Sequence, residues 1–221
     1  MPCDDIRDDC ARQRFFAKSD PTTLVSVAYF ERIWAGAPEE LTPEHFALRR
    51  EFLLARVRAG ERVLDLGCGD GAFAQALAAH GANPVGVDVA LEALRRARRR
   101  APQLEFHHSG EVLPFGDGEF AVVWAGELFE HVQDGLGLLA EVTRVLRPGG
   151  RLLLSTPDHG WWRRLSVALS RRRFEAQFEP RSDHVRFFTA HSLRTLLAAA
   201  GFDEPDVRSH RGVLLASATR R

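Results

Sequence analysis

Short apolar runs alternate with amphipathic stretches from about residue 62 to the end of the chain. The runs have the length of buried strands, and the stretches between them repeat their apolar positions with the period of a helix. Such alternation is typical of a parallel sheet whose strands are joined by helices. The predicted strands are 63–66, 85–89, 104–107, 120–125, 151–155, 206–209 and 212–217, and the predicted helices are 72–80, 91–100, 135–146 and 191–200.

The region before the first predicted strand has a different pattern. Residues 1–21 are polar and dense in charge, which indicates an arm outside the core. Apolar positions at helical spacing predict a helix over 22–34, and Pro43 at a first-turn position predicts a second helix over 42–59. We therefore divide the chain into an N-terminal arm with cap helices, residues 1–60, and a main domain, residues 61–221, with an insertion at about 158–184.

Composition narrows the classes of protein that fit this pattern. The 221 residues include 30 Lys and Arg against 30 Asp and Glu, so the formal net charge is zero and we expect no nucleic-acid partner. No apolar run reaches the roughly 18 residues of a membrane span. The first residues, MPCDDIRDDC, lack the pattern of a secretory signal, and three cysteines, Cys3, Cys10 and Cys68, cannot all pair. The sequence therefore predicts a cytoplasmic protein.

The segment after the first predicted strand has the composition of a ligand loop. It reads VLDLGCGDG over 63–71, with glycines at alternate positions ahead of a helix. Glycine lets the backbone approach a ligand closely and adopt a positive φ, and the first turn of the helix offers N–H groups to an anion. A tight connection between strand and helix would use the same residues, so this loop alone leaves both interpretations open.

Two aspartates narrow the identity of the ligand. Asp65, two residues ahead of the first glycine, would repel a pyrophosphate but attract an ammonium, and the G-x-G-x-G spacing differs from the dinucleotide fingerprint. Asp88, at the end of the second predicted strand, can accept the hydroxyls of a ribose, although it could also cap the next helix. A ligand that joins an amino acid to a nucleoside satisfies both aspartates. S-adenosylmethionine is such a ligand.

Several motifs, in order, resemble those of the class I S-adenosylmethionine-dependent methyltransferases. VLDLGCGDG is similar to their cofactor loop, GVDVA to the strand end that binds ribose, LPFGDGEFAVVWA to their fourth strand and RVLRPGGRLLLSTP to their fifth. The resemblance covers residues 62–218 and implies an α/β fold: a Rossmann-like, seven-stranded, mostly parallel sheet with helices on both faces. It also implies methyl transfer from S-adenosylmethionine to a small-molecule acceptor by direct in-line displacement.

The resemblance further assigns individual residues to the cofactor. Asp88 would hold the ribose and Val89 the adenine, and the methionyl part would be held by Asp65, Gly67, Cys68 and Gly69. Ser109 stands where family members often have an aspartate that binds the adenine amine, so a hydroxyl replaces a carboxylate there. The complete set implied for the cofactor is Asp65, Gly67, Cys68, Gly69, Asp88, Val89, Ser109, Gly110, Gly126 and Glu127.

Candidate metal ligands and a candidate catalytic base follow the fourth predicted strand. The order E-x-x-E-H at Glu127, Glu130 and His131 is similar to a subset that includes ubiquinone-pathway O-methyltransferases and small-RNA 3′-end methyltransferases, in which these positions hold a divalent metal. Many relatives keep Glu-His here without a metal, and no fourth ligand has a suggestive spacing, so we assign no metal. The predicted catalytic residues, each a base or an orienting group for the acceptor, are His131 and His184, with His159 as a further candidate.

The insertion interleaves aromatic and arginine side chains between Trp161 and Phe178. It could be a lid over the acceptor, an interfacial helix on anionic lipid, a patch for RNA, or an amphipathic helix that covers the sheet. We favour the lid and an oxygen nucleophile on a small molecule, with nitrogen and carbon acceptors left open. An RNA or lipid-linked acceptor, a non-catalytic S-adenosylmethionine-binding protein and a nicotinamide oxidoreductase are the alternatives. Peripheral membrane contact and the choice between monomer and homodimer stay open.

Overall fold

A computed structural model describes residues 21–39, 41–110, 112–172, 175 and 185–221. Within these residues, seven strands form one sheet in the order β3-β2-β1-β4-β5-β7-β6. Neighbouring strands from β3 to β5 are parallel, whereas β7 runs antiparallel between β5 and β6. This order confirms the predicted seven-stranded, mostly parallel sheet. The strands are β1 (Arg62–Leu66), β2 (Asn83–Asp88), β3 (Glu105–His108), β4 (Phe120–Gly126), β5 (Leu146–Pro157), β6 (Phe202–His210) and β7 (Val213–Arg220).

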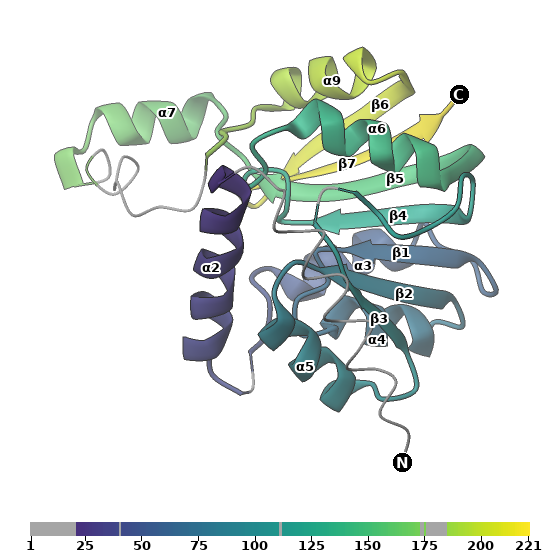
Figure 1. Cartoon of the computed structure of the whole chain (residues 1–221). Coiled ribbons are helices and arrows are strands. Elements are labelled where there is room, and N and C mark those ends of the chain that lie inside the picture. Colours follow the sequence, from purple (N-terminus) through teal and green to yellow (C-terminus); the bar gives the residue numbers. More distant parts are fainter. Residues whose placement is uncertain (1–20, 40, 111, 173–174, 176–184) are drawn as a thin grey trace.

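Helices cover both faces of the sheet, as predicted (Figure 1). One face carries α3 (Phe46–Leu54), α4 (Ala72–Ala79) and α5 (Leu91–Arg100), and the other carries α6 (Gly135–Val145) and α9 (Ala190–Ala199). Helix α2 (Pro21–Gly36) stands across the carboxyl ends of the parallel strands, and α7 (Trp161–Ala168) extends away from the sheet (Figure 1).

The core follows from strands that are buried on both faces. On β1, Val63 packs into the cluster beneath α3 and α4, whereas its neighbour Leu64 packs into the cluster beneath α6 and α9. Trp124 on β4 is fully buried and packs against Phe73 of α4, with ring centroids 5.3 Å apart. A strand that is covered on both faces must be apolar at nearly every position. This requirement is why continuous apolar runs locate the central strands.

Helix α2 is attached to α5 by polar contacts at two points. The carboxylate of Glu31 accepts hydrogen bonds from the backbone N–H groups of Leu91 and Glu92, at 2.5 and 3.1 Å, and so caps the start of α5. The guanidinium of Arg96, buried on α5, donates to the backbone carbonyls of Ala37 and Pro38 at 2.8 and 2.7 Å. These contacts hold α2 over the edge of the sheet where the parallel strands end.

The predicted second helix, 42–59, is wrong at both ends. The helix α3 spans only Phe46–Leu54, because His45 ahead of it adopts a left-handed conformation, with φ at 52°. Pro43 therefore lies outside the helix instead of in its first turn. The predicted arm, residues 1–21, falls almost wholly outside the described residues. The division of the chain at residue 60 stays a prediction.

None of the described helices combines the length and the apolar character that crossing a membrane requires.

The cap that Glu31 provides gives a test of how α2 is held. We expect Glu31→Ala to lower the free energy of unfolding by about 1 kcal/mol, because two N–H groups at the start of α5 lose their acceptor and the helix dipole loses a compensating charge. Urea unfolding measures the change. Glu51→Ala, at an exposed position on α3, is the matched control, and an equal effect of both substitutions would contradict the cap.

Candidate functional site

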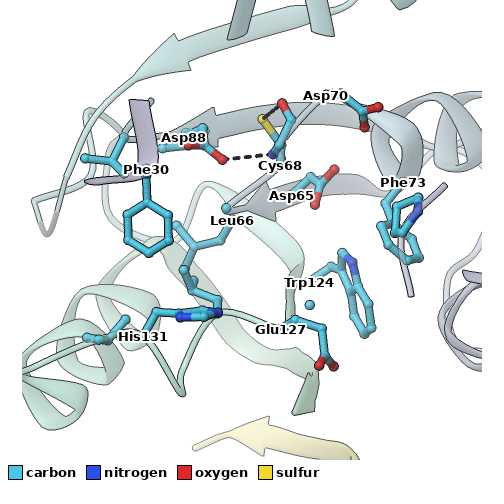
Figure 2. A pocket seen from close by; sticks show the side chains of 18 of the residues that line it. Phe30, Asp65, Leu66, Cys68, Asp70, Phe73, Asp88, Trp124, Glu127 and His131 are labelled. Atoms are coloured by element: carbon cyan, nitrogen blue, oxygen red, sulfur yellow. Dashed lines mark hydrogen bonds between the residues drawn. The ribbon is translucent and has the colours of Figure 1, made fainter. Parts of the chain in front are cut away.

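A cavity of about 480 Å³ opens at the carboxyl ends of β1, β2 and β4, beneath α2. Its walls come from the loops that follow these strands, from α2 and from the start of α3 and α4. Figure 2 shows Phe30 and His131 next to each other on one side, with Asp65, Phe73 and Trp124 across the cavity. Parallel α/β sheets bind their ligands at this edge, and the predicted loop and strand ends meet there.

The glycine loop after β1 has the backbone that its sequence predicts. Gly67, Gly69 and Gly71 all have positive φ, at 72°, 54° and 78°. A Cβ on Gly69 would lie 2.8 Å from the ring of Trp34, so the indole of α2 packs directly on the bare backbone of this loop. Residue 69 must therefore be glycine for two reasons, its conformation and its contact with α2.

Asp88 holds the glycine loop against the end of β2. Its Oδ2 accepts the N–H of Gly69 and its Oδ1 accepts the N–H of Ala90, both at 2.8 Å. Burial raises the pKa of Asp88, and these N–H donors partly offset the rise. The carboxylate thus fixes the backbone ahead of α5, although Glu31 and not Asp88 accepts the first N–H groups of that helix, and Asp88 also lines the cavity.

Asp65 is a buried carboxylate that is incompletely satisfied. It is 2% exposed, and its Oδ2 has no hydrogen-bond partner among the described residues. Burial raises the pKa of Asp65 to about 7, partly offset by the backbone N–H of Ala74. A buried carboxylate oxygen without a donor is costly. Because Asp65 lines the cavity, a cationic donor group of a ligand fits this position.

Arg49 is a buried cation that the sequence pattern did not single out. It is 3% exposed and reaches from α3 into the cavity, where its Cζ lies 4.8 Å from the ring centroid of Phe73. Its Nε donates to Ser155 Oγ at 2.9 Å, and its Nη1 donates to the backbone carbonyl of Glu44 at 3.0 Å. Burial lowers the pKa of Arg49, while the nearby carboxylates, Glu127 first, act in the opposite direction.

Gly126, the last residue of β4, and Glu127, which follows it, are held by the same network. A Cβ on Gly126 would lie 2.4 Å from Arg49 Nη2, so a side chain there would displace the guanidinium. Glu127 has a positive φ of 53°, which is uncommon outside glycine. Its Oε1 accepts the Ser155 hydroxyl at 2.8 Å and lies 3.9 Å from Arg49 Nε. These contacts hold the strained backbone in place.

Glu130 and His131 form the wall next to α2. Glu130 is 1% exposed; its Oε2 accepts the hydroxyl of Thr156 at 2.9 Å, and its Oε1 lies 4.0 Å from His131 Nε2. Burial, followed by the charge of Glu127, raises the pKa of Glu130 to about 8. The imidazole of His131 meets Phe30 edge to face, with ring centroids 5.5 Å apart. Both residues line the cavity, so an acceptor there would meet an imidazole beside a carboxyl group.

The structure brings together most of the predicted site residues. All ten predicted cofactor residues and His131 line the cavity. The Ser109 hydroxyl donates to the backbone carbonyl of Val112, so it is already engaged within its own loop. His159 does not line the cavity and instead packs against Phe187, and His184 lies outside the described residues. Among the described residues, no group of three or more His, Cys, Asp or Glu side chains could hold a metal ion.

The sequence predicted two cap helices, but it did not indicate which residues of α2 and α3 line the cavity. Arg49 follows Phe46 by three residues and precedes Leu53 by four, so it occupies the apolar face of its helix. A charged residue on a buried face is an indication of function that the pattern does contain. Trp34 and Phe30 had no comparable signal, because aromatic residues on an amphipathic helix are usually part of a core.

A sequence profile of a methyltransferase domain matches residues 39–204. The chain belongs to this family. The ubiquinone biosynthesis O-methyltransferase of Albidiferax ferrireducens is 30% identical over 216 residues, which cover 92% of this chain and 84% of that protein. The protein of the same name from Aromatoleum aromaticum is 29% identical over 200 residues, with coverages of 86% and 85%.

Solved structures agree with the fold of this methyltransferase. The crystal structure of an S-adenosylmethionine-dependent methyltransferase from Mesorhizobium loti matches with a TM-score of 0.63 and 21% identity, covering 85% of this chain and all of that one. The protein is a class I methyltransferase and its cofactor is S-adenosylmethionine. The cavity fits that molecule, because an orphaned oxygen of Asp65, a buried cation at Arg49 and a glycine cradle match an ammonium, a carboxylate and a closely held backbone.

The raised pKa of Asp65 predicts how the ligand-free methyltransferase responds to pH. In the unfolded chain the group ionises near 3.8, but in the folded chain only near 7, so stability falls as the pH rises through this window. We expect Asp65→Asn to be more stable than the wild type at about pH 8, by about 2 to 4 kcal/mol, and equal to it at about pH 4.

Chemical unfolding at both pH values, without ligand, tests this expectation. Asp206→Asn, at an exposed position on β6, is the matched control. If the stabilities of the wild type and of Asp65→Asn change equally between the two pH values, the expectation is contradicted.

Proposed function

We propose that the protein transfers a methyl group from S-adenosylmethionine to a hydroxyl oxygen of a small-molecule acceptor, with His131 as the base. The observation that supports this most directly is that the His131 imidazole lines the same cavity as Asp65 and Asp88, on the wall across from the glycine loop. The O-methyltransferase names of the related proteins support an oxygen acceptor.

We assign the methionyl part of the cofactor to two opposite charges in the cavity. Asp65 would accept hydrogen bonds from the ammonium through its unpartnered oxygen, and Arg49 would hold the carboxylate. Both side chains are buried, at 2% and 3% exposure, so each charge gains strongly from a partner. From the sequence we expected the N–H groups at the start of α4 to bind an anion, and a buried guanidinium is a stronger partner for the carboxylate than those N–H groups.

Asp88 is assigned to the ribose. Each of its oxygens already accepts one backbone N–H and retains a second lone pair for a hydroxyl donor. Val89 and Gly110 also line the cavity and would contact the adenine, with Ser109 beside them. Since the hydroxyl of Ser109 donates within its own loop, it is left as an acceptor for the adenine amine.

For this reaction the protein must chiefly position the methyl donor and the acceptor and remove one proton from the acceptor. S-adenosylmethionine supplies a methyl group on a positively charged sulfur, which is already activated for in-line attack. His131 would take the proton from the acceptor hydroxyl, and the carboxyl of Glu130, 4.0 Å from its Nε2, would stabilise the imidazolium when it is ionised, above its raised pKa of about 8. Phe30, Ile33 and Trp34 of α2 cover the cavity and would exclude water from it.

A lipid-linked acceptor, an RNA acceptor and a protein that binds the cofactor without catalysis are the other hypotheses. Methyl-labelled S-adenosylmethionine incubated with phenols, aliphatic alcohols, amines, RNA and lipid vesicles separates them. Label that appears on a small hydroxyl compound supports the proposal. Tight cofactor binding with no labelled product in any arm would refute it. A cytoplasmic location and a monomeric or homodimeric state stay predictions of the sequence.

Asp65 predicts the pH dependence of cofactor binding. The carboxyl must be ionised to pair with an ammonium, and its pKa in the ligand-free protein is about 7. We therefore expect affinity to fall about fivefold between pH 7 and pH 6, and about tenfold for each further pH unit. In Asp65→Asn the affinity should be weaker at pH 7 and should lose this slope. Isothermal calorimetry at about pH 6 and pH 7 measures both, with Asp206→Asn as the control; a slope that survives in the variant would rule out the pairing.

His131→Gln tests the proposed base. We expect kcat to fall by about 10²- to 10⁴-fold, because the amide cannot take the proton, while the dissociation constant for S-adenosylmethionine changes little. The wild-type rate should rise with pH and then level off, and the variant should lack the rising limb. His210→Gln, at an exposed position on β6, is the matched control. A variant that keeps the wild-type kcat would remove His131 from the chemistry.

A further inference from the structure

Residues 185–188, here called the return segment, run between the loop after β4 and the end of β5. The N–H groups of Val185 and Arg186 both donate to the backbone carbonyl of Glu130, at 2.8 and 3.1 Å. Farther along, Phe188 forms an isolated parallel bridge with Asp158, and its carbonyl accepts the N–H of His159 at 2.8 Å. The return segment therefore links the loop after β4 to the end of β5 by hydrogen bonds, at the edge of the sheet where the cavity lies.

The side chain of Arg186 donates further hydrogen bonds to the same loop, the one that follows β4. Its Nε donates to the backbone carbonyl of Val132 at 2.7 Å, and its Nη2 donates to the carbonyl of Gln133. The planar guanidinium suits this task, since it presents donors in a fixed fork to two acceptors at once. A lysine ammonium in its place would be a point donor on a flexible stem.

The residues that Arg186 and the return segment hold are the ones that line the cavity. Glu130, His131, Val132 and Gln133 all lie on its wall, whereas Arg186 does not. His131 sits in the middle of this run, so carbonyls are fixed on both sides of it, at Glu130 and at Val132 and Gln133. The side chain of Glu130 also accepts a hydrogen bond from the hydroxyl of Thr156 on β5. Without Arg186, the part of the loop that follows His131 would lose both of these side-chain hydrogen bonds.

We propose that Arg186 is a positioning residue for methyl transfer, which fixes the loop 130–133 so that His131 faces the acceptor. This inference rests on the proposed role of His131. Within the described part of the chain, the hydrogen bonds of the Arg186 side chain go to backbone carbonyls, so it acts through the placement of the imidazole. Small displacements of a base from its acceptor lower rates strongly, by up to about 100-fold for about 1 Å. The effect should therefore appear in kcat and leave cofactor affinity unchanged.

The experiment compares Arg186→Ala and Arg186→Lys with the control Arg208→Ala in the full chain. Arg208 is exposed on β6 and pairs with Asp206 away from the cavity, at 3.0 Å. Two readouts are used: amide hydrogen exchange of residues 130–134 by mass spectrometry, and methyl transfer from labelled S-adenosylmethionine with catechol as the acceptor probe. Calorimetry with S-adenosylmethionine and the melting temperature report whether the rest of the protein is intact.

We expect Arg186→Ala to speed exchange at 130–134 by about tenfold or more and to lower kcat by about 10- to 100-fold, with cofactor affinity within about twofold of the wild type. Arg186→Lys should recover part of both, and Arg208→Ala should change neither. Exchange that stays at the wild-type rate in Arg186→Ala would overturn the inference, and so would a loss of cofactor affinity as large as the loss of kcat.

The two readouts also separate this inference from the proposed function. If the wild type binds S-adenosylmethionine but methylates no acceptor, the proposed function fails, while exchange alone decides whether Arg186 fixes the loop. If Arg186→Ala does not fold, the same comparison is made with Arg186→Lys, for which wild-type exchange and wild-type kcat together would overturn the inference.

Discussion

Ionisable groups buried at the edge of the sheet without a full set of hydrogen-bond partners among the described residues are the constraint on which the site depends. Asp65 and Glu130 each keep one buried oxygen that has no hydrogen-bond partner among the described residues, and Arg49 is the buried cation that faces them. Such groups cost stability unless a ligand completes them. The apolar core, which packs tightly on both faces of the sheet, supplies the free energy that lets the fold tolerate this arrangement.

The N-terminal helices are part of the same arrangement. Helix α3 delivers Arg49 into the cavity, where its guanidinium fits only because residue 126 is glycine. Helix α2 lays Trp34 on the glycine loop and Phe30 against His131. The cofactor loop, the candidate base and the cap are therefore joined through direct contacts, although they lie far apart in the sequence.

The sequence is most informative where an element's burial or backbone conformation requires a particular residue type at each position. Central strands are apolar throughout, so their runs located the sheet, and alternate glycines located the loop because positive φ demands them. The start of α3 was misplaced because His45 adopts a left-handed conformation ahead of the helix, which the pattern of apolar positions did not indicate. The positive φ of Glu127 was likewise not indicated by the local sequence, because it is stabilised by contacts of the side chain with Ser155 and Arg49.

Long-range contacts set the limit of what could be predicted for the site. Asp65 and Asp88 were found because each stands at a strand end, where the topology fixes direction. Arg49 and Arg186 act on residues far away in the sequence, through Ser155 in one case and through the carbonyls after His131 in the other. Such pairings become visible only when the chain is folded.

The position of α2 has a kinetic consequence. Trp34 packs on the glycine loop, and Glu31 accepts hydrogen bonds from the first turn of α5. The rate at which a molecule leaves the cavity is therefore set by movement of α2 away from these contacts or by the width of the opening that α2 leaves. The turnover number of such an enzyme can then be governed by release of the spent, demethylated nucleoside, with chemistry the faster step. Evolution could adjust turnover by altering how tightly α2 is fastened, while every reacting group stays where it is.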